Sequence, residues 1–284
     1  MRKSYLAFSA AAFALLLLSA PAVACDKIDA LLKKAYPAAT ATKNGFEVSG
    51  DYLRRIDPDE VACKAWPARP ELTLVAVPLI EANPPQEGEN KGDVEIILAD
   101  TASGRPIARR LEKDMAFSDA VRFANLSFDT ARYDLKAGLR AFGVRTMQAN
   151  SSQIDPFSET ALWLYTFEGG RIDRVLDGLI VERENGENNG DCDGALTTIN
   201  RTLTLGGAGP KGYRDLVVDQ TETLETSKKD GTDCKSTDAP GAGRQVVLHF
   251  GDRHYDPPAG SKSEPDKPES DLFSFIEIGA PGGK

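Results

Sequence analysis

The chain has 284 residues, of which 41% are hydrophobic and 27% charged, and its net charge is −9. This acidic balance argues against a general binder of nucleic acid or anionic membranes, because such a protein needs a basic surface to displace counterions from phosphates. The length suffices for one large or two ordinary domains, so disulfides are not needed merely to complete a core.

Residues 1–24 have the pattern of a bacterial secretory signal peptide. A basic pair, Arg2 and Lys3, precedes an apolar run. Ala22 and Ala24 then form an A-x-A cleavage pattern. The run is short for a membrane span of ~20 residues, and no later segment approaches that length. We therefore expect an exported protein, periplasmic or secreted, without a membrane span. Cleavage would leave 43 acidic residues against 32 basic ones, a net charge of −11.

Four cysteines would remain after this cleavage, namely Cys25, Cys63, Cys192 and Cys234. An even number of cysteines in an exported protein predicts two disulfides, and we pair Cys25 with Cys63 and Cys192 with Cys234. An alternative rests on the sequence AVAC, which resembles a lipobox with Ala22 where leucine is usual. A lipid anchor at Cys25 would leave Cys63 as an odd thiol, so parity favours the unanchored protein.

The predicted elements begin with one short helix, in the segment DKIDALLKKAYP. It places Ile28, Leu31, Leu32 and Ala35 at helical spacing, and Pro37 ends the run. From residue 71 onward, short β-branched and aromatic runs alternate with Gly, Asn, Asp and Pro. They include ELTLVAVPLIE, DVEIILAD, GLRAFGVRTM, TINRTLTLG, RDLVVDQTETLET and RQVVLHF. This pattern predicts a mainly β fold of antiparallel β-sandwich-like domains with a short N-terminal helix.

Two hairpins are predicted, one in VEIILADTASGRPIARRL (94–111) and one in ALWLYTFEGGRIDRVL (161–176). In the second, Trp163, Tyr165 and Phe167 share one face of a strand and could form a stacking platform for a sugar or peptide. Leu162 and Leu164 make the other face apolar as well. A strand that is apolar on both faces is more often a central strand covered on both sides.

The segment FDTARYDL contains the pattern D-x-A-x-Y, at Asp129, Ala131 and Tyr133. It resembles the tyrosine corner of immunoglobulin-like sandwiches, in which the tyrosine hydroxyl bonds back to the chain. The flanking segments LADTASGRPI and LKAGLRAFGVR are similar to secreted prealbumin-like sandwich modules, with Ser103-Gly104 in place of the usual Thr-Gly. This resemblance covers residues 93–147 and implies an architecture without any catalytic group.

The polar, turn-rich interval ANSSQIDPF suggests a domain boundary. We expect an N-terminal helix with a β-sandwich-like domain in residues 25–150 and a second β-rich domain, or a continuation of the first, in residues 151–255. Residues 256–284 are rich in Pro, Ser and charge at their start, which predicts a flexible tail. The tail ends in DLFSFIEI, which we expect to dock as a strand on the body of the protein, with a partner's sheet edge as the alternative.

The stretch ENGENNGDCDGA (184–195) gathers acidic and amide side chains around Cys192. In a calcium loop Asn189, Asp191 and Asp193 would be ligands, but Asn200 stands where a bidentate glutamate is needed. We therefore predict a turn held by a disulfide. The turn-rich segment KKDGTDCKSTDAPGAG is predicted to be the second long connection held by that bond.

Only two histidines are present, His249 and His254. A zinc site from them and Asp252 is imaginable, but the spacing does not support it. The sequence also lacks the G-x-S-x-G, S-x-x-K and H-E-x-x-H motifs, so it predicts no catalytic, metal or cofactor residues.

These observations favour a non-enzymatic, exported binding protein whose partner is a protein or a cell-envelope component. The alternative is a periplasmic hydrolase whose site residues cannot be paired from the sequence.

Overall fold

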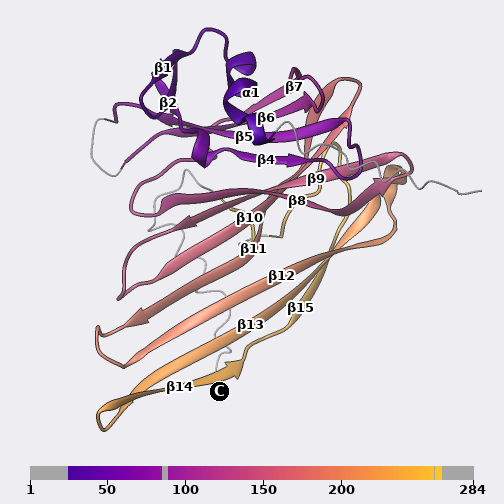
Figure 1. The fold of residues 1–284 in the computed structure, drawn as a ribbon. Helices are drawn as coiled ribbons and strands as arrows, with labels where there is room; N and C mark the ends of the chain where they lie inside the picture. The colour runs from indigo at the N-terminus through magenta and orange to yellow at the C-terminus, as the bar shows by residue number, and fades with distance from the viewer. Residues whose placement is uncertain (1–24, 85–88, 259, 264–284) are drawn as a thin grey trace, which may run out of the picture.

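The computed structural model describes residues 25–84, 89–258 and 260–263, which form two antiparallel sheets and one short α-helix (Figure 1). The predicted mainly β, sandwich-like fold with an N-terminal helix is confirmed. In the described residues no helix has the length and apolar character that a membrane span requires. The predicted signal peptide, residues 1–24, and the terminal segment DLFSFIEI lie outside the described residues.

The first sheet has seven strands in the order β1-β2-β3-β5-β6-β7, with β4 paired to β5. Its strands are β1 Thr40–Thr42, β2 Gly45–Val48, β3 Arg54–Ile56, β4 Ala62–Ala65, β5 Leu72–Glu81, β6 Gly92–Asp100 and β7 Pro106–Glu112. The sequence predicts β5, β6 and β7 but not the four strands before them. Those four have only three or four residues each, which is too short for an alternating pattern to be recognised.

The N-terminal helix covers the outer face of this sheet. A single 3₁₀ turn, η1 Cys25–Lys27, leads into α1 Ile28–Ala35. Leu31, Leu32 and Ala35 are buried in a cluster with residues of β5 and β6. The amphipathic pattern predicted from the sequence therefore corresponds to the packed face of the helix. A second 3₁₀ turn, η2 Pro58–Glu60, precedes β4.

The second sheet has eight strands, with β8 to β14 each beside the next along the chain and β15 also paired to β13. Its strands are β8 Arg122–Lys136, β9 Leu139–Ala149, β10 Phe157–Glu168, β11 Arg171–Asn188, β12 Gly194–Ala208, β13 Arg214–Asp230, β14 Asp233–Pro240 and β15 Arg244–Leu248. The short turn η3 Pro210–Gly212 separates β12 from β13. Both predicted hairpins are confirmed, as β6–β7 and β10–β11.

Strand β10 is buried on both faces. Trp163 and Tyr165 belong to the core between the two sheets, together with residues of β5, β6 and β9. Leu162 and Leu164 face the other way and belong to a second core with residues of β11, β13 and β15. The prediction of a central strand covered on both sides is therefore confirmed, and Trp163 and Tyr165 supply core area instead of a binding platform.

After β15 the chain returns to β11 and closes the second core. The N–H of Tyr255 donates to the carbonyl oxygen of Val175 at 2.7 Å, and the N–H of Ser263 donates to that of Gly178 at 2.7 Å. Ser261 and Ser263 are buried. Residues 260–263 were predicted from their composition to be part of a flexible linker. They are held instead by backbone hydrogen bonds to β11, which composition does not reveal.

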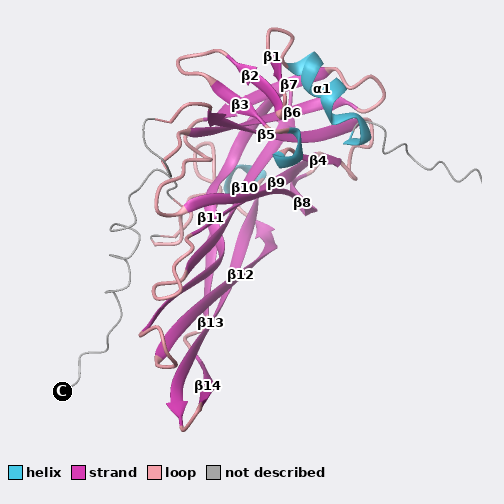
Figure 2. Ribbon diagram, turned by 60° about the vertical axis from the view of Figure 1, so that its left-hand side comes forward, coloured by secondary structure: helices cyan, strands magenta, loops and turns pink. Residues whose placement is uncertain are grey.

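The distal part of the second sheet extends beyond both cores. Figure 2 shows β12, β13 and β14 projecting away from the two packed sheets. We call residues 182–200 and 221–240, which include the ends of β11, β12 and β13 and all of β14, the blade. Its strands form a continuous ladder, from Glu182 opposite Asn200 to Asp230 opposite Asp233.

One segment of the blade was predicted wrongly. The segment KKDGTDCKSTDAPGAG was expected to be a long connection, but it contains the end of β13, a tight turn and β14. Gly231 takes the first central position of the turn with φ 68°, as two-residue hairpin turns require. The residues of β14 have low β propensity, so the turn and the pairing with β13 override that propensity.

The sheets divide between β7 and β8, whereas the expected boundary near residue 150 falls between β9 and β10, which are neighbours in the second sheet. The division at residue 150 stays a prediction.

Because β10 contributes to both cores, shortening a side chain on its second face should destabilise the whole protein. We expect Leu164→Ala to lower the free energy of unfolding in urea by about 2–5 kcal/mol. The matched change Thr202→Ala, at an exposed position of β12, should alter it by less than about 0.5 kcal/mol. Equal losses of unfolding free energy in the two variants would contradict the burial of Leu164 in a second core.

Candidate functional site

The four cysteines form two disulfides, Cys25–Cys63 and Cys192–Cys234, with Cα–Cα distances of 5.6 and 5.3 Å. These are the pairs that the sequence predicts. The first joins the start of the helical segment to β4. The second joins the β11–β12 turn to β14, so it connects two parts of the blade that are 42 residues apart in sequence.

The acidic stretch 184–195 is half strand and half turn. Strand β11 continues to Asn188 and β12 starts at Gly194. Within the turn, the side-chain oxygen of Asn189 accepts hydrogen bonds from the N–H groups of Asp191 and Asp193 at 3.0 and 3.2 Å. The carboxylate of Asp191 lies 2.6 Å from Nζ of Lys229. These acids therefore bind their own chain, and the absence of a metal here stays a prediction.

The two histidines are not brought together. Nδ1 of His249 lies 2.8 Å from Asp215, and Nε2 of His254 lies 2.8 Å from Asp256. Asp252 instead pairs with Lys211. In the described part of the chain no hydrogen bond joins His249 to a Ser, Thr or Cys side chain. His249 is therefore not paired with a nucleophile among the described residues. The hydrolase alternative stays a prediction.

The D-x-A-x-Y pattern closes a bulge in β8. The hydroxyl of Tyr133 donates to the carboxylate of Asp129 at 3.1 Å, not to the backbone as in a tyrosine corner. The same carboxylate accepts from the N–H of Ala131 at 2.9 Å and from Arg145 at 2.8 Å. Burial raises the pKa of Asp129, but these donors outweigh that effect and hold it below its ordinary value. The register shift between Asp129 and Tyr133 marks the bulge. The hydrogen bonds to the Asp129 carboxylate stabilise it.

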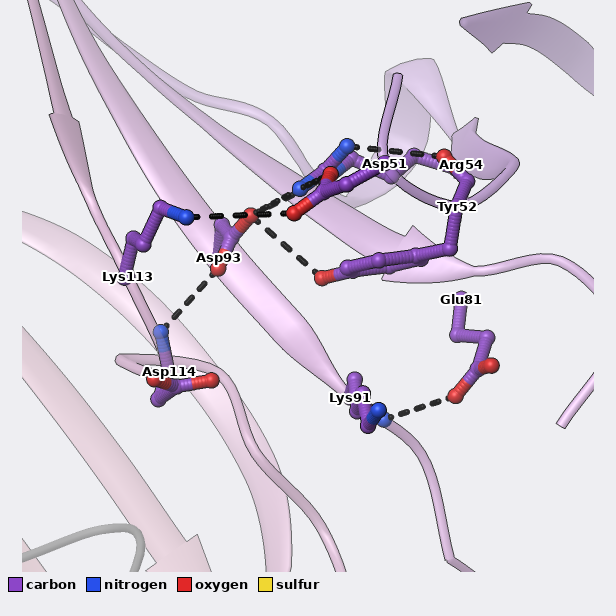
Figure 3. Close-up of polar contacts among 8 residues, drawn as sticks. All are labelled: Asp51, Tyr52, Arg54, Glu81, Lys91, Asp93, Lys113 and Asp114. Atoms are coloured by element: carbon purple, nitrogen blue, oxygen red, sulfur yellow. Dashed lines mark hydrogen bonds and ion pairs between the residues drawn. The ribbon is translucent and has the colours of Figure 1, made fainter. Parts of the chain in front are cut away.

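A buried ion pair connects β3 to β6 (Figure 3). Nε and Nη2 of Arg54 donate to Oδ2 of Asp93 at 3.0 and 2.8 Å. The Tyr52 hydroxyl donates to the same oxygen at 3.3 Å, and the N–H of Asp114 donates to Oδ1 at 3.0 Å. All donors point at one carboxylate, whose side chain is 3% exposed.

An open cavity of about 330 Å³ lies beside this ion pair. Asp51 at its rim lies 2.7 Å from Nη2 of Arg54 and 3.8 Å from Nζ of Lys113. The hydrogen bond from Arg54 is the main cause that lowers the pKa of Asp51. Each of these charges thus has an opposite partner. The cluster ties three segments together, and its paired groups are not poised for chemistry.

The blade differs from the rest of the fold in its exposure. Of residues 182–200 and 221–240, Cys192 alone is buried, and every residue of β14 is exposed. The order of the blade therefore rests on backbone pairing and on the Cys192–Cys234 bond, not on an apolar core. Such a surface contributes little to the stability of the protein.

One face of the blade is acidic and rich in threonine. Opposite residues in an antiparallel ladder project from the same face. The register places the following side chains together: Glu182, Glu184, Leu196, Thr198, Asn200, Thr221, Thr223, Glu225 and Asp238. The four carboxylates form no ion pair within the described residues. Glu225 lies directly opposite Asp238, a like-charge arrangement that destabilises a sheet. We call this set the acidic face.

The sequence gives no local signal for either the Arg54–Asp93 pair or the acidic face. Arg54 and Asp93 are separated by 39 residues and meet only through the pairing of β3, β5 and β6. The acidic face depends on β14, which the composition predicts to be a loop. The alternation of Thr and Glu in RDLVVDQTETLET indicates one polar strand face. It does not indicate which strands lie beside it.

The chain shows no match to a protein-family model, to a curated protein or to a solved structure.

The Arg54–Asp93 pair can be tested by removing one charge. Asp93→Ala removes the buried carboxylate and leaves the Arg54 guanidinium with the exposed Asp51 as its acidic partner, so we expect a loss of about 3–5 kcal/mol of unfolding free energy in urea. Glu60→Ala, which breaks the exposed Arg55–Glu60 pair, should cost at most about 1 kcal/mol. The double variant Arg54→Met/Asp93→Ala should be more stable than Asp93→Ala. A double variant that is less stable would show that the charge itself is not the cause.

Proposed function

We propose that the chain is an exported, non-enzymatic binding protein, periplasmic or secreted, which uses the acidic face of the blade to recognise a protein or a cell-envelope component. The observation that carries this proposal is that a long, regular part of the sheet has Cys192 as its single buried residue. Ordering a segment costs conformational entropy, which apolar burial normally offsets. A blade without such burial is most simply explained by the surface that it presents.

The charges of the acidic face support a recognition role. Glu225 and Asp238 are directly opposed, and their repulsion disfavours the fold. Local features that act against stability are typical of functional surfaces. A partner with positive charge would relieve the repulsion, so the acidic face favours a cationic protein surface or a cationic envelope component.

Export is supported by the disulfides, since such bonds persist in oxidising compartments. The Cys25–Cys63 bond also favours the unanchored form, because the sulfur of Cys25 cannot carry both a disulfide and a lipid thioether.

The proposal is tested by photo-crosslinking in the native host. A photoreactive residue at Thr223, on the acidic face, should yield one discrete adduct that weakens at high salt. The same residue at Thr226, on the opposite face of the same strand, is the matched control and should yield little. Glu225→Gln should reduce the adduct at Thr223 while maintaining or raising the unfolding free energy, because it removes the repulsion from Asp238.

Two outcomes would overturn the proposal. One is an equal yield of adducts at Thr223 and Thr226, which would mean that the acidic face is not distinguished from its surroundings. The other is an unchanged adduct in Glu225→Gln, which would separate binding from the carboxylates.

A further inference from the structure

A polar row crosses three strands of the second sheet next to the blade. Arg201 of β12 lies opposite Gln220 of β13, and Gln220 lies opposite Arg244 of β15. Directly opposed side chains project from the same face of a sheet. These three residues line a small cavity of about 30 Å³ together with Val218, Val246, Pro258 and Ser261. We call this cavity the arginine notch.

The arginines of the notch have no acidic partner among the described residues. Nε of Arg201 donates to Oε1 of Gln220 at 2.9 Å, and its Nη1 donates to the carbonyl oxygen of Ile180 at 2.8 Å. Both acceptors are neutral. The second terminal nitrogen of Arg201, Nη2, and the whole guanidinium of Arg244 have no such bond in the part of the chain that the structure describes.

The other charged groups near Arg201 leave an excess of positive charge around it. The carboxylate that acts on Arg201 is that of Glu159, and Glu159 accepts a hydrogen bond from Nε of Arg183 at 3.0 Å. The guanidiniums of Arg183 and Arg201 therefore share one carboxylate. Burial is the main cause that lowers the pKa of Arg201 to about 10, and the charges of Arg183 and Arg244 add to it.

An uncompensated, partly buried cation is costly to a fold, since buried charges are normally paired. Arg201 is held in place by Gln220 and Ile180, so it cannot simply turn toward solvent without losing two hydrogen bonds. An anion bound in the notch would compensate its charge.

We propose that the arginine notch binds an oxyanion, the carboxylate or phosphate group of a small ligand. Arg201 and Arg244 supply charge-assisted donors, and the amide nitrogen of Gln220 is oriented to donate because its oxygen is occupied by Arg201. A water molecule needs about 10–15 Å³ of such a cavity, so the notch admits about two oxygen atoms of the ligand. The rest of the ligand lies outside it. This inference does not depend on the function proposed for the blade.

The test is calorimetric titration of the full chain with inorganic phosphate and, separately, with acetate, at constant low ionic strength. We expect saturable binding of one anion per chain. Arg244→Met should weaken it about tenfold, the effect of one charge-assisted hydrogen bond. Arg244 is exposed and its side chain forms no hydrogen bond or ion pair in the described chain, so this variant should fold normally. Arg201→Met should abolish binding, and its thermal unfolding is recorded beside the titration.

Arg122→Met is the matched control, because Arg122 is an exposed strand arginine outside the notch. It should bind like the wild type. Binding of phosphate alone would identify a tetrahedral anion as the ligand group, and binding of acetate alone a carboxylate. The proposal is overturned if neither anion binds saturably, or if Arg244→Met binds as tightly as Arg122→Met.

Discussion

Strand β10 needs cover on both faces, and the arrangement of the other strands follows from this need. Trp163 and Tyr165 require the first sheet against one face, and Leu162 and Leu164 require a second layer against the other. The layer is supplied by β13, β15 and the returning segment up to Ser263, which is bonded to β11. Strand β10 therefore joins the two cores, together with its neighbours β9 and β11, which also contribute residues to both.

The blade follows a different principle. Strands β11, β12 and β13 continue well beyond the residues that the cores bury, and β14 extends the ladder without adding a buried side chain. The Cys192–Cys234 bond closes a long loop at this end, which in the chain-entropy model stabilises by about 4 kcal/mol. Covalent linkage thus replaces apolar burial in the blade. Glu225 opposite Asp238 indicates that this surface is not arranged for stability.

The sequence predicts the body of the fold better than its extensions. Hydrophobic periodicity locates α1, β5, β10 and both hairpins, because their side chains face a core. It does not locate β14, in DCKSTDAP, because no residue there is buried and only the turn at Gly231 and the pairing with β13 define the strand. It assigns residues 260–263 to a linker because their composition is polar and has no apolar periodicity, although backbone hydrogen bonds to β11 hold them and Ser261 and Ser263 are buried.

The candidate sites cannot be predicted from the sequence for a different reason. The cysteines could be paired by parity, but Arg54 and Asp93, or Arg201 and Arg244, carry no recognisable spacing. They meet through strand register, in β3, β5 and β6 for the first pair and in β12, β13 and β15 for the second. The D-x-A-x-Y pattern suggests a tyrosine corner, but the hydroxyl of Tyr133 donates to the Asp129 carboxylate and not to the backbone.

The strand ladder and the Cys192–Cys234 disulfide order the blade independently of the cores around β10. Amide hydrogen exchange followed by mass spectrometry tests it, comparing the wild type with the double variant Cys192→Ser/Cys234→Ser. We expect faster exchange in residues 182–200 and 221–240 of the variant, with the protection of β10 unchanged. Unchanged exchange in the blade, or an equal loss of protection in β10, would contradict it.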